Sequence, residues 1–218
     1  MKAPDTENEL FANASSLAGV TLGELAGEAK LAVPSSLHHA KGWVGELLER
    51  RLGATAQSRP VPDFEKIGVE LKTIPLNRHL MPQESTFVSS APLSHTAGLR
   101  WVTSSVKAKL NRVLWVPIEA ATSLPVAQRR IGIPILWSPS PGDMEILRYD
   151  WEEHIERIAL GHLDEIDARL GTYLQVRPKA HNRDARTATT DSRGAPAATL
   201  PRGFYLRTSF TRKILGDY

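Results

Sequence analysis

The sequence of 218 residues contains no cysteine. This absence excludes disulfide bonds, thiolate zinc sites, iron–sulfur clusters and catalysis by a cysteine nucleophile. It is consistent with a reducing cytoplasm, and the polar, acidic start of the chain is unlike a secretory signal peptide. A membrane-spanning helix needs about 20 apolar residues, and no apolar run in the sequence approaches that length. The sequence therefore predicts a cytoplasmic protein without a membrane partner.

Several common catalytic motifs are also missing. The chain has no glycine-rich phosphate loop, no dinucleotide-binding fingerprint and no Gly-x-Ser-x-Gly elbow. His38 and His39 are adjacent and therefore lack the i,i+4 spacing of a zinc-binding helix. The pair His181-Asn182 superficially resembles a His-Asn nuclease motif but has no second half. These absences leave one constellation with mechanistic content, which lies in residues 63–72.

The composition, with 41% hydrophobic and 23% charged residues, is that of an ordinary globular protein with one large domain or two lobes. Thr21 and Glu24 have the spacing of a helix capping box, and the apolar run 112–118 is typical of a central strand. The irregular alternation of elements predicts an α+β fold with a mixed sheet. We expect helices in residues 7–32 (two), 42–52, 103–111, 143–170 and from 211, and strands in 67–74, 85–91, 112–118, 172–176 and 203–206. We also expect a turn into a short strand in 129–137 and a polar loop to residue 198.

Residues 63–72 read Asp-Phe-Glu-Lys-Ile-Gly-Val-Glu-Leu-Lys, a pattern typical of a turn that runs into a strand. Because side chains alternate along a strand, Glu70 and Lys72 share one face, roughly 6.6 Å apart. Gly68 would allow the chain to fold back and bring Asp63 towards that face. Two converging carboxylates can hold a hard divalent cation, and a lysine can orient water or stabilise charge on a phosphate. The pattern therefore predicts a metal-dependent phosphodiesterase.

The motif is short, and a Glu-x-Lys pair is expected by chance about once in a chain of this composition. The alternative is an exposed strand with a surface ion pair. Charge placement supplies a second observation, because acidic residues dominate positions 143–167 and basic residues outnumber acidic ones from position 169 onward. We expect the acidic residues to form an exposed face of the predicted helix. A basic C-terminal segment is typical of a polyanion partner, although a solvated basic surface would have the same composition.

Two stretches of the basic segment carry residues suited to reading DNA bases. Arg177, Lys179 and Arg183 follow a predicted strand, and arginine pairs well with guanine in the major groove. The second stretch, residues 201–207, contains Tyr205 and Arg207. An aromatic ring can pack against a base or its methyl group. The alternative for residues 204–206 is a core strand with at least two buried side chains.

Sequence blocks in a fixed order along the chain carry a family resemblance. The blocks are Lys41-Gly-Trp-Val-Gly-Glu-Leu-Leu-Glu49, Asp63-Phe-x-x-Ile-Gly-Val-Glu70-Leu-Lys72-Thr-Ile-Pro, Arg112-Val-Leu-Trp-Val-Pro, Ala127-Gln-Arg-Arg-Ile-Gly, Leu136-Trp-Ser-Pro, Tyr173-Leu-Gln-Val-Arg177-Pro-Lys179-Ala and Leu200-Pro-Arg-Gly-Phe-Tyr205-Leu. Together they resemble the MutH family, the strand-discriminating endonucleases of bacterial methyl-directed mismatch repair. The resemblance extends from Thr21 to about Leu215.

The resemblance implies a restriction-endonuclease-like fold: a mixed sheet flanked by helices, with two lobes around a DNA-binding cleft. The implied lobes are approximately residues 1–105 for catalysis and 106–218 for DNA reading. The resemblance further implies Mg²⁺-dependent nicking of double-stranded DNA at hemimethylated GATC, on the unmethylated strand and 5′ to the G, with Mn²⁺ and Ca²⁺ as alternative occupants of the metal site. It implies activation by MutL, which the mismatch sensor MutS recruits, and a monomeric cytoplasmic protein associated with the bacterial nucleoid.

The resemblance also assigns roles to single residues in the catalytic lobe. Asp63 and Glu70 correspond to the metal-binding acids, and the carbonyl of Leu71 would complete the protein ligands. Lys72 corresponds to the catalytic lysine, and Glu49 to an additional active-site acid on the preceding helix.

The predicted DNA-binding residues come from several parts of the chain. By resemblance, Tyr205 occupies the position linked to sensing adenine methylation, and Phe87 that of a DNA-contacting aromatic. The complete predicted set is Lys41, Phe87, Arg177, Lys179, Tyr205 and Arg207.

The sequence departs from the family pattern at Gln57, where we expect glycine, and in residues 181–198. Two other functions stay open as alternatives. One is a GATC-cutting restriction endonuclease, which shares this catalytic lobe but needs two active sites to break both strands. The other is a DNA-binding module without catalysis. The single motif set favours a nicking enzyme, and the intact Asp63, Glu70 and Lys72 set argues against a module without catalysis.

Overall fold

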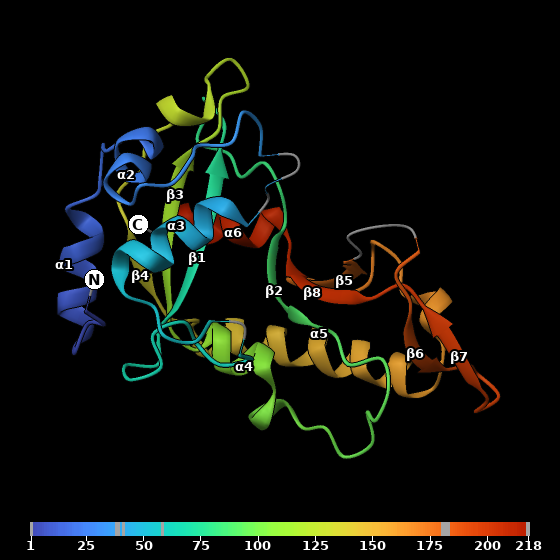
Figure 1. Ribbon diagram of the computed structural model, residues 1–218. Coiled ribbons are helices and arrows are strands. Elements are labelled where there is room, and N and C mark those ends of the chain that lie inside the picture. The colour runs from blue at the N-terminus through green and yellow to red at the C-terminus, as the bar shows by residue number, and fades with distance from the viewer. Residues whose placement is uncertain (1, 38–39, 41, 58, 180–183, 217–218) are drawn as a thin grey trace. The chain divides into compact units, whose positions relative to one another are not determined.

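The computed structural model describes residues 2–37, 40, 42–57, 59–179 and 184–216. Its contacts divide the chain into two compact units (Figure 1). Unit 1 comprises Met1–Glu84, Asn111–Ser138 and Thr211–Tyr218, and unit 2 comprises Ser85–Leu110 and Pro139–Phe210. The chain therefore passes between the units more than once, whereas the predicted lobes have a single boundary near residue 105. The functions assigned to the two lobes stay predictions.

Unit 1 contains a three-stranded mixed sheet of β1 (Glu70–Leu76), β3 (Val113–Glu119) and β4 (Ile135–Trp137). β3 is the central strand, as its apolar run predicted: it pairs parallel with β1 and antiparallel with β4. Parallel neighbours need a long crossover connection. Here the connection from β1 to β3 includes residues 85–110, which belong to unit 2, and this explains why the units interleave in sequence.

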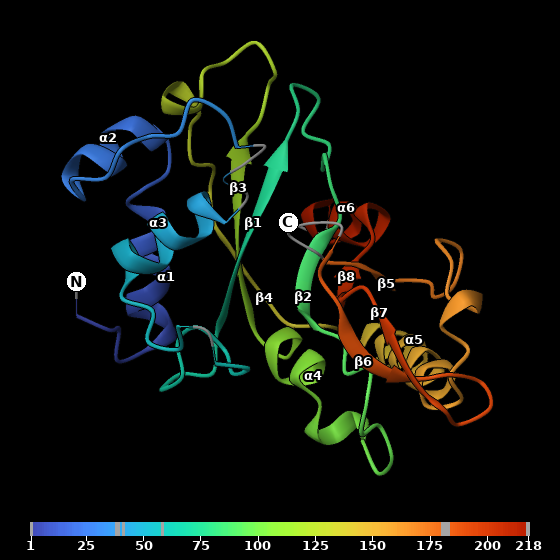
Figure 2. The ribbon, with the colours of Figure 1, turned by 45° about the vertical axis from the view of Figure 1, so that its right-hand side comes forward.

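Three helices, α1 (Glu7–Ser15), α2 (Leu22–Glu28) and α3 (Trp43–Leu52), pack on this sheet (Figure 2). The predicted capping box begins α2: the Thr21 hydroxyl accepts a hydrogen bond from the backbone N–H of Glu24 at 3.2 Å, and the Glu24 carboxylate accepts one from the N–H of Thr21 at 2.8 Å. α3 ends at Gly53, whose φ of 80° is the left-handed conformation that glycine adopts without steric cost. The turn Val126–Gln128 contacts α2.

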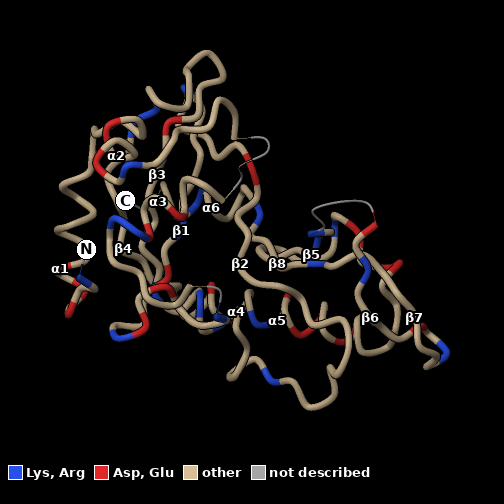
Figure 3. Tube along the Cα trace, in the orientation of Figure 1, with Lys and Arg blue, Asp and Glu red and all other residues tan. Residues whose placement is uncertain are grey.

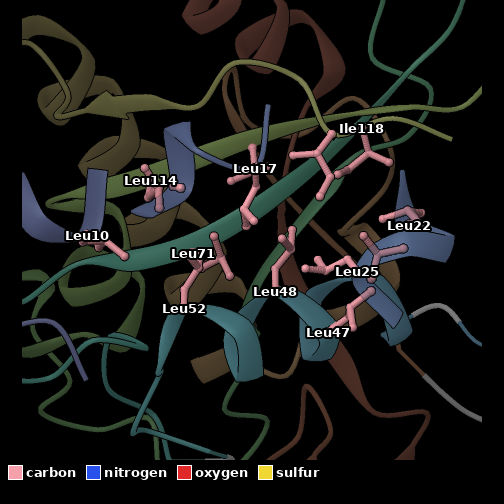
Figure 4. Close-up of a cluster of buried hydrophobic side chains, with 14 of the residues drawn as sticks. Leu10, Leu17, Leu22, Leu25, Leu47, Leu48, Leu52, Leu71, Leu114 and Ile118 are labelled. Carbon is pink, nitrogen blue, oxygen red and sulfur yellow. The ribbon is translucent and has the colours of Figure 1, made fainter. Parts of the chain in front are cut away.

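Buried leucines of the three helices meet the apolar face of β1 and β3 (Figure 4). Full burial of one such side chain stabilises a fold by about 1.5–3 kcal/mol. Leu71 lies in this cluster, and its neighbours in β1 point to the opposite face. The core therefore fixes the orientation of the strand that carries Glu70 and Lys72. Core leucines include Leu10, Leu22, Leu25, Leu47, Leu48, Leu52 and Leu114.

Unit 2 contains an antiparallel sheet in the order β2-β8-β5, formed by β2 (Thr86–Ser90), β8 (Arg202–Leu206) and β5 (Leu174–Pro178). Helix α5 (Pro141–Ala159) packs against β5, and α4 (Ser105–Leu110) against β2. Short turns of 3-10 helix cover Trp101–Thr103 and Leu163–Glu165. Helix α6 (Thr208–Gly216) begins in unit 2 and ends in unit 1.

The long helix α5 corrects two expectations. The prediction of helix through residue 170 is wrong beyond Ala159, because Gly161 has a φ of 74° and lies so close to the Asp191 backbone that an added Cβ would be 2.3 Å away. The expectation that its acidic residues form an exposed face is wrong for Asp143 and Asp150, which are buried. Asp143 belongs to the N-terminal cap with Ser140.

Asp150 fixes the start of β5. Its carboxylate accepts three backbone hydrogen bonds, from Thr172 at 2.7 Å, Tyr173 at 2.6 Å and Leu174 at 2.8 Å. His154, one turn later on α5, places Nε2 3.3 Å from the Leu174 carbonyl oxygen, and burial lowers the pKa of this imidazole. These contacts determine where β5 begins and therefore which of its residues face each side of the sheet.

The expected polar loop contains a hairpin instead, so that prediction is wrong for β6 (Thr187–Thr190) and β7 (Pro196–Thr199). The turn between them uses Asp191, whose Oδ1 accepts the N–H groups of Arg193 and Ala195 at 2.9 Å each, and Gly194 with a φ of 80°. Short threonine- and alanine-rich strands carry little apolar periodicity. Across the described ranges, no helix combines the length and the apolar character needed to cross a membrane.

Candidate functional site

The turn before β1 brings Asp63 to the start of the strand. Phe64 and Val69 form an antiparallel bridge, with the Phe64 N–H 2.9 Å from the Val69 carbonyl oxygen. Gly68 has a φ of 66° in this turn, as the predicted chain reversal requires. The backbone N–H of Leu71 donates to Oδ2 of Asp63 at 2.9 Å. The carboxylate is therefore held beside the backbone of the strand that carries Glu70 and Lys72.

Glu70 and Lys72 lie side by side on one face of β1. The Nζ atom of Lys72 is 2.5 Å from Oε1 of Glu70, and the Glu70 side chain is only 1% exposed. A surface ion pair would be solvated and worth little. This burial contradicts the alternative of an exposed strand with a surface Glu–Lys pair.

Helix α3 adds Glu49 to the same group of charges. The pKa of Glu49 is raised to about 7, first by burial and then by the negative charge of Asp63, with a smaller contribution from Glu70, while Lys72 opposes the shift. The spacing of Glu49 from Leu48 and Leu52 places it at the border of the buried face of α3, which contacts β1. Four ionisable groups from two elements and one turn thus interact, and a perturbed pKa in such a cluster is typical of a functional site.

The cluster has the donor chemistry of a site for a hard divalent cation. Asp63 and Glu70 supply carboxylate oxygens beside the backbone of Leu71, and oxygen ligands are those preferred by Mg²⁺ and Ca²⁺. Within the described ranges no three His, Asp or Glu side chains form a metal-binding group. The residues fit a cation that keeps several water ligands, which is the usual behaviour of Mg²⁺.

A second group of predicted residues meets on the β2-β8-β5 sheet of unit 2. The ring centroids of Phe87 and Tyr205 are 5.3 Å apart in an edge arrangement, and these residues are register partners across β2 and β8. The Nζ atom of Lys179 lies 3.5 Å from the Phe87 ring centroid, and the guanidinium carbon of Arg177 lies 5.9 Å from that of Tyr205. Arg177 also donates to the Ser85 hydroxyl at 2.7 Å. Two aromatic rings and two cations therefore share one face, which we call the aromatic–cationic face.

Figure 3 shows Lys and Arg along β5, while α5 carries acidic as well as basic residues. Arg177 and Lys179 are exposed, and Phe87 and Tyr205 are half-buried. Side chains of this kind are suited to contact phosphates and base edges. The expectation that residues 204–206 include at least two buried side chains is confirmed for Phe204 and Leu206.

Arg207, another predicted DNA-binding residue, makes its hydrogen bonds to backbone carbonyls and not to the aromatic–cationic face. Arg207 donates through Nε to the Gly171 carbonyl at 3.0 Å and through a terminal nitrogen to the Leu170 carbonyl at 2.7 Å. It therefore anchors the segment before β5, and its predicted contact with DNA stays a prediction. Lys41 lies outside the described residues, as do His38, His39, His181, Asn182 and Arg183.

The sequence analysis did not single out Gln175, which the structure places on the aromatic–cationic face. Gln175 is the register partner of Tyr205 and lies two residues before Arg177 in β5. The signal is present in the alternation Leu174, Gln175, Val176, Arg177, in which the apolar residues share one face and the polar residues the other.

The fold and the cluster together define a class of enzyme. A small mixed sheet presents an Asp…Glu-x-Lys set on its first strand, beside a helix that adds a glutamate. This is the architecture and residue set of restriction-endonuclease-like nucleases.

Comparison with known proteins identifies the family. Residues 52–150 match the family model described as "MutH: DNA mismatch repair enzyme MutH". The chain is 52% identical over 215 residues to the DNA mismatch repair protein MutH of Serratia proteamaculans, covering 99% of this chain and 94% of the relative. It is 52% identical over 212 residues to the same protein of Vibrio parahaemolyticus, covering 97% and 94%. It is 51% identical over 218 residues to that of Escherichia coli O157:H7, covering 100% and 95%.

The chain belongs to the MutH family of DNA mismatch repair enzymes and is a DNA endonuclease. The resemblance inferred from the sequence blocks is confirmed, as is the mixed, restriction-endonuclease-like fold.

Proposed function

We propose that this endonuclease nicks the unmethylated strand of hemimethylated GATC sites, uses Mg²⁺ and is activated by MutL. The observation that carries the proposal is the buried meeting of Asp63, Glu70 and Lys72 with Glu49, in a chain about half identical to DNA mismatch repair proteins MutH. A buried set of this composition has little use as a structural ion pair, because desolvated charges seldom stabilise a fold.

Asp63, Glu70 and the Leu71 carbonyl would hold the metal. Bound Mg²⁺ supplies charge neutralisation at the phosphate and a lowered pKa for a coordinated water. The protein holds the ligand groups in advance: the Leu71 N–H orients the Asp63 carboxylate, and the Lys72 ammonium holds Glu70 at 2.5 Å. Such preorganisation reduces the reorganisation needed when charge develops during the reaction.

Lys72 and Glu49 supply the remaining chemistry of the proposed site. The Lys72 ammonium, with a side chain only 13% exposed, would donate hydrogen bonds to the attacking water or to a phosphate oxygen as negative charge grows there. The Glu49 carboxyl has a pKa of about 7 and can therefore accept or release a proton near neutral pH. An ordinary surface glutamate would be fully ionised at that pH.

The aromatic–cationic face of unit 2 would read the site. Arg177 and Lys179 are proposed to contact base edges or phosphates, and Phe87 and Tyr205 to pack against bases. Their mutual contacts, including the 3.5 Å approach of the Lys179 ammonium to the Phe87 ring centroid, hold the cations in place before DNA binds. A single catalytic set in one monomer accounts for cleavage of one strand.

The test uses defined GATC duplexes in unmethylated, hemimethylated and fully methylated form, with Mg²⁺, in the presence and absence of MutL. We expect wild type to nick the unmethylated strand, and Asp63→Ala to abolish nicking. Asp164→Ala, a change at an exposed aspartate of unit 2, is the matched control and should behave as wild type. Nicking retained by Asp63→Ala would refute the assignment, and a linear product would favour the restriction-endonuclease alternative.

A further inference from the structure

Gln175 occupies a central place on the aromatic–cationic face. It is paired with Tyr205 across β5 and β8, and Arg177 in the same strand is paired with Gly203. Directly opposite residues in an antiparallel pair have Cβ atoms about 4.5–5.5 Å apart. The Gln175 side chain therefore lies beside that of Tyr205 and on the same face of the sheet as Arg177. Leu174 and Val176, which flank it in the strand, are buried on the opposite face.

No hydrogen bond to the Gln175 amide is found among the residues that the structure describes. The residue is 7% exposed, and its amide nitrogen and oxygen are not among the fully buried polar atoms that lack a partner, so the amide is open to solvent on this face. Its neighbours on this face differ, because Arg177 donates to Ser85 and the Lys179 ammonium lies over Phe87. A donor and an acceptor that no protein group uses are free to bind a partner that covers this face. The unused donor and acceptor therefore point to a ligand that supplies them.

The pattern of this amide matches one DNA base. A glutamine offers a carbonyl acceptor beside an NH₂ donor, and adenine presents the complementary pair in the major groove, an N6–H donor beside the N7 acceptor. Guanine presents two acceptors there, and cytosine and thymine do not present this pair. In a Watson–Crick pair, one N6 hydrogen bonds to thymine and the other points into the major groove. Methylation at N6 replaces that outward hydrogen, so a glutamine bonded to it would also register the methyl group.

We propose that Gln175 is a specificity-determining residue that binds N6 and N7 of the unmethylated adenine in the recognised site. This inference rests on the proposed function, because it places the adenine of GATC on the aromatic–cationic face. It adds a bidentate amide contact to the cationic and aromatic contacts already assigned to this face. Bound DNA would cover the amide and exclude water from it, so a wrong base would leave the donor and the acceptor unpaired.

The test pairs a change in the protein with a change in a single DNA atom. We measure kcat/KM for cleavage of a hemimethylated GATC duplex by wild type and by Gln175→Met. Methionine has a side chain of similar length to glutamine but lacks the amide donor and acceptor. A second duplex carries 7-deazaadenine, which lacks the N7 acceptor, in the cleaved strand. We expect wild type to lose on the order of 10-fold on the second duplex, and Gln175→Met to lose a similar or larger factor on the first. The two losses should not multiply when they are combined, because the change in the protein and the change in the DNA remove the same contact.

Two further variants keep the test decisive. Gln128→Met makes the same change at an exposed glutamine of unit 1 and should match wild type on both duplexes. Gln175→Glu is almost the same shape as the wild-type side chain and accepts from N6–H but cannot donate to N7, so it should also lose its response to 7-deazaadenine. It replaces Gln175→Met if urea unfolding shows that the methionine variant does not fold.

The outcomes separate this inference from the proposed function. If the losses from Gln175→Met and 7-deazaadenine multiply, Gln175 does not contact N7 and the inference is overturned, while cleavage at GATC still upholds the proposed function. If wild type cleaves GATC duplexes no faster than duplexes without the sequence, the proposed function fails and this inference fails with it. If the losses do not multiply, the contact is established.

Discussion

The candidate catalytic residues of unit 1 and the aromatic–cationic face of unit 2 differ in how far apart their members lie in the chain. Asp63, Glu70 and Lys72 fall within ten consecutive residues, and a 2.9 Å hydrogen bond from the backbone N–H of Leu71 to the Asp63 carboxylate already connects the two ends of that segment. Phe87 and Tyr205, which touch in the structure, lie on strands separated by most of unit 2. The first arrangement depends on a local turn, and the second depends on the register of three strands.

The two regions also differ in solvent exposure. Glu70 is 1% exposed and its lysine partner 13%, whereas Arg177 and Lys179 are exposed and make their contacts with rings and a hydroxyl at the surface. Catalysis needs charges in a site from which water is largely excluded, because electrostatic interactions are stronger there. Reading DNA needs side chains that can reach a partner. The difference predicts that changes in unit 1 affect turnover and that changes in unit 2 affect site recognition.

The largest expected effect tests this separation with two lysines. Lys72→Ala should reduce the nicking rate at saturating DNA by about 10²–10³-fold, because a preorganised donor at the developing charge is lost, with little change in DNA affinity. Lys179→Ala should instead weaken DNA binding and leave the rate of the bound complex nearly unchanged. Single-turnover nicking and a binding titration measure the two quantities. Equal effects of both variants on affinity would remove the distinction between the two regions.

A smaller effect is expected when the register of unit 2 is disturbed at Gly203. A Cβ added there would lie 2.8 Å from Cε2 of Phe87 and 3.2 Å from the Ser89 carbonyl oxygen. Gly203→Ala should therefore displace the Phe87 ring and cost about 1–3 kcal/mol in stability or site affinity, as overpacking does. Urea unfolding and binding to GATC duplexes measure both.

Gly27→Ala is the control for Gly203→Ala, because the added Cβ meets nothing within 4 Å in α2 and alanine favours a helix. Phe87→Leu combined with Gly203→Ala should recover part of the lost stability. If Gly203→Ala were as neutral as Gly27→Ala, the close packing of Phe87 on β8 would not constrain the aromatic–cationic face.

Glu49 provides a pH-dependent test of the buried region. Its pKa is about 7 in the folded chain, above the ordinary value of 4.5, so the unfolded chain loses this proton first as pH rises. The contribution of Glu49 to stability is therefore lost progressively between pH 4.5 and about 7. Glu49→Gln removes this loss and should gain stability relative to wild type as pH rises, by on the order of 1 kcal/mol after solvent screening.

The measurement for Glu49 is urea unfolding in metal-free buffer at several pH values through that range. Glu46→Gln, at an exposed position on the same helix, serves as the control and should show no comparable trend. A Glu49→Gln curve parallel to wild type would mean that Glu49 does not share its environment with Asp63, Glu70 and Lys72.

The smallest expected effect concerns the loop before Asp63. Gln57 has a φ of 54°, in the left-handed region that costs a residue with a Cβ about 1–2 kcal/mol. Gln57→Gly should stabilise the protein by about 0.5–1 kcal/mol, because relief of this strain is partly offset by the greater entropy of glycine in the unfolded chain. We expect Gln57→Gly to leave the nicking rate unchanged, because the strain in this loop affects stability and not catalysis. Lower stability would show that the Gln57 side chain makes a compensating contact.

The sequence predicted best where the physical signal is local. The capping box at Thr21, the end of α3 at Leu52 and the central position of β3 were each predicted correctly, because capping and burial leave a pattern in neighbouring residues. The prediction failed where distant backbone decides the outcome. Helix α5 stops early beside the Asp191 backbone, and Asp150 is buried because the N–H groups of residues 172–174 reach it from β5.

The sequence by itself determined the chemical set of the candidate active site, because Asp63, Glu70 and Lys72 lie on one turn and one strand whose geometry follows from alternation and from Gly68. Its blocks also determined the family. Only the tertiary structure decided that this set is buried and that Glu49 interacts electrostatically with it, because α3 must first pack on β1 through the leucine core. Strand pairing likewise placed Gln175 opposite Tyr205, because register between distant strands is set by long-range packing that no local pattern specifies.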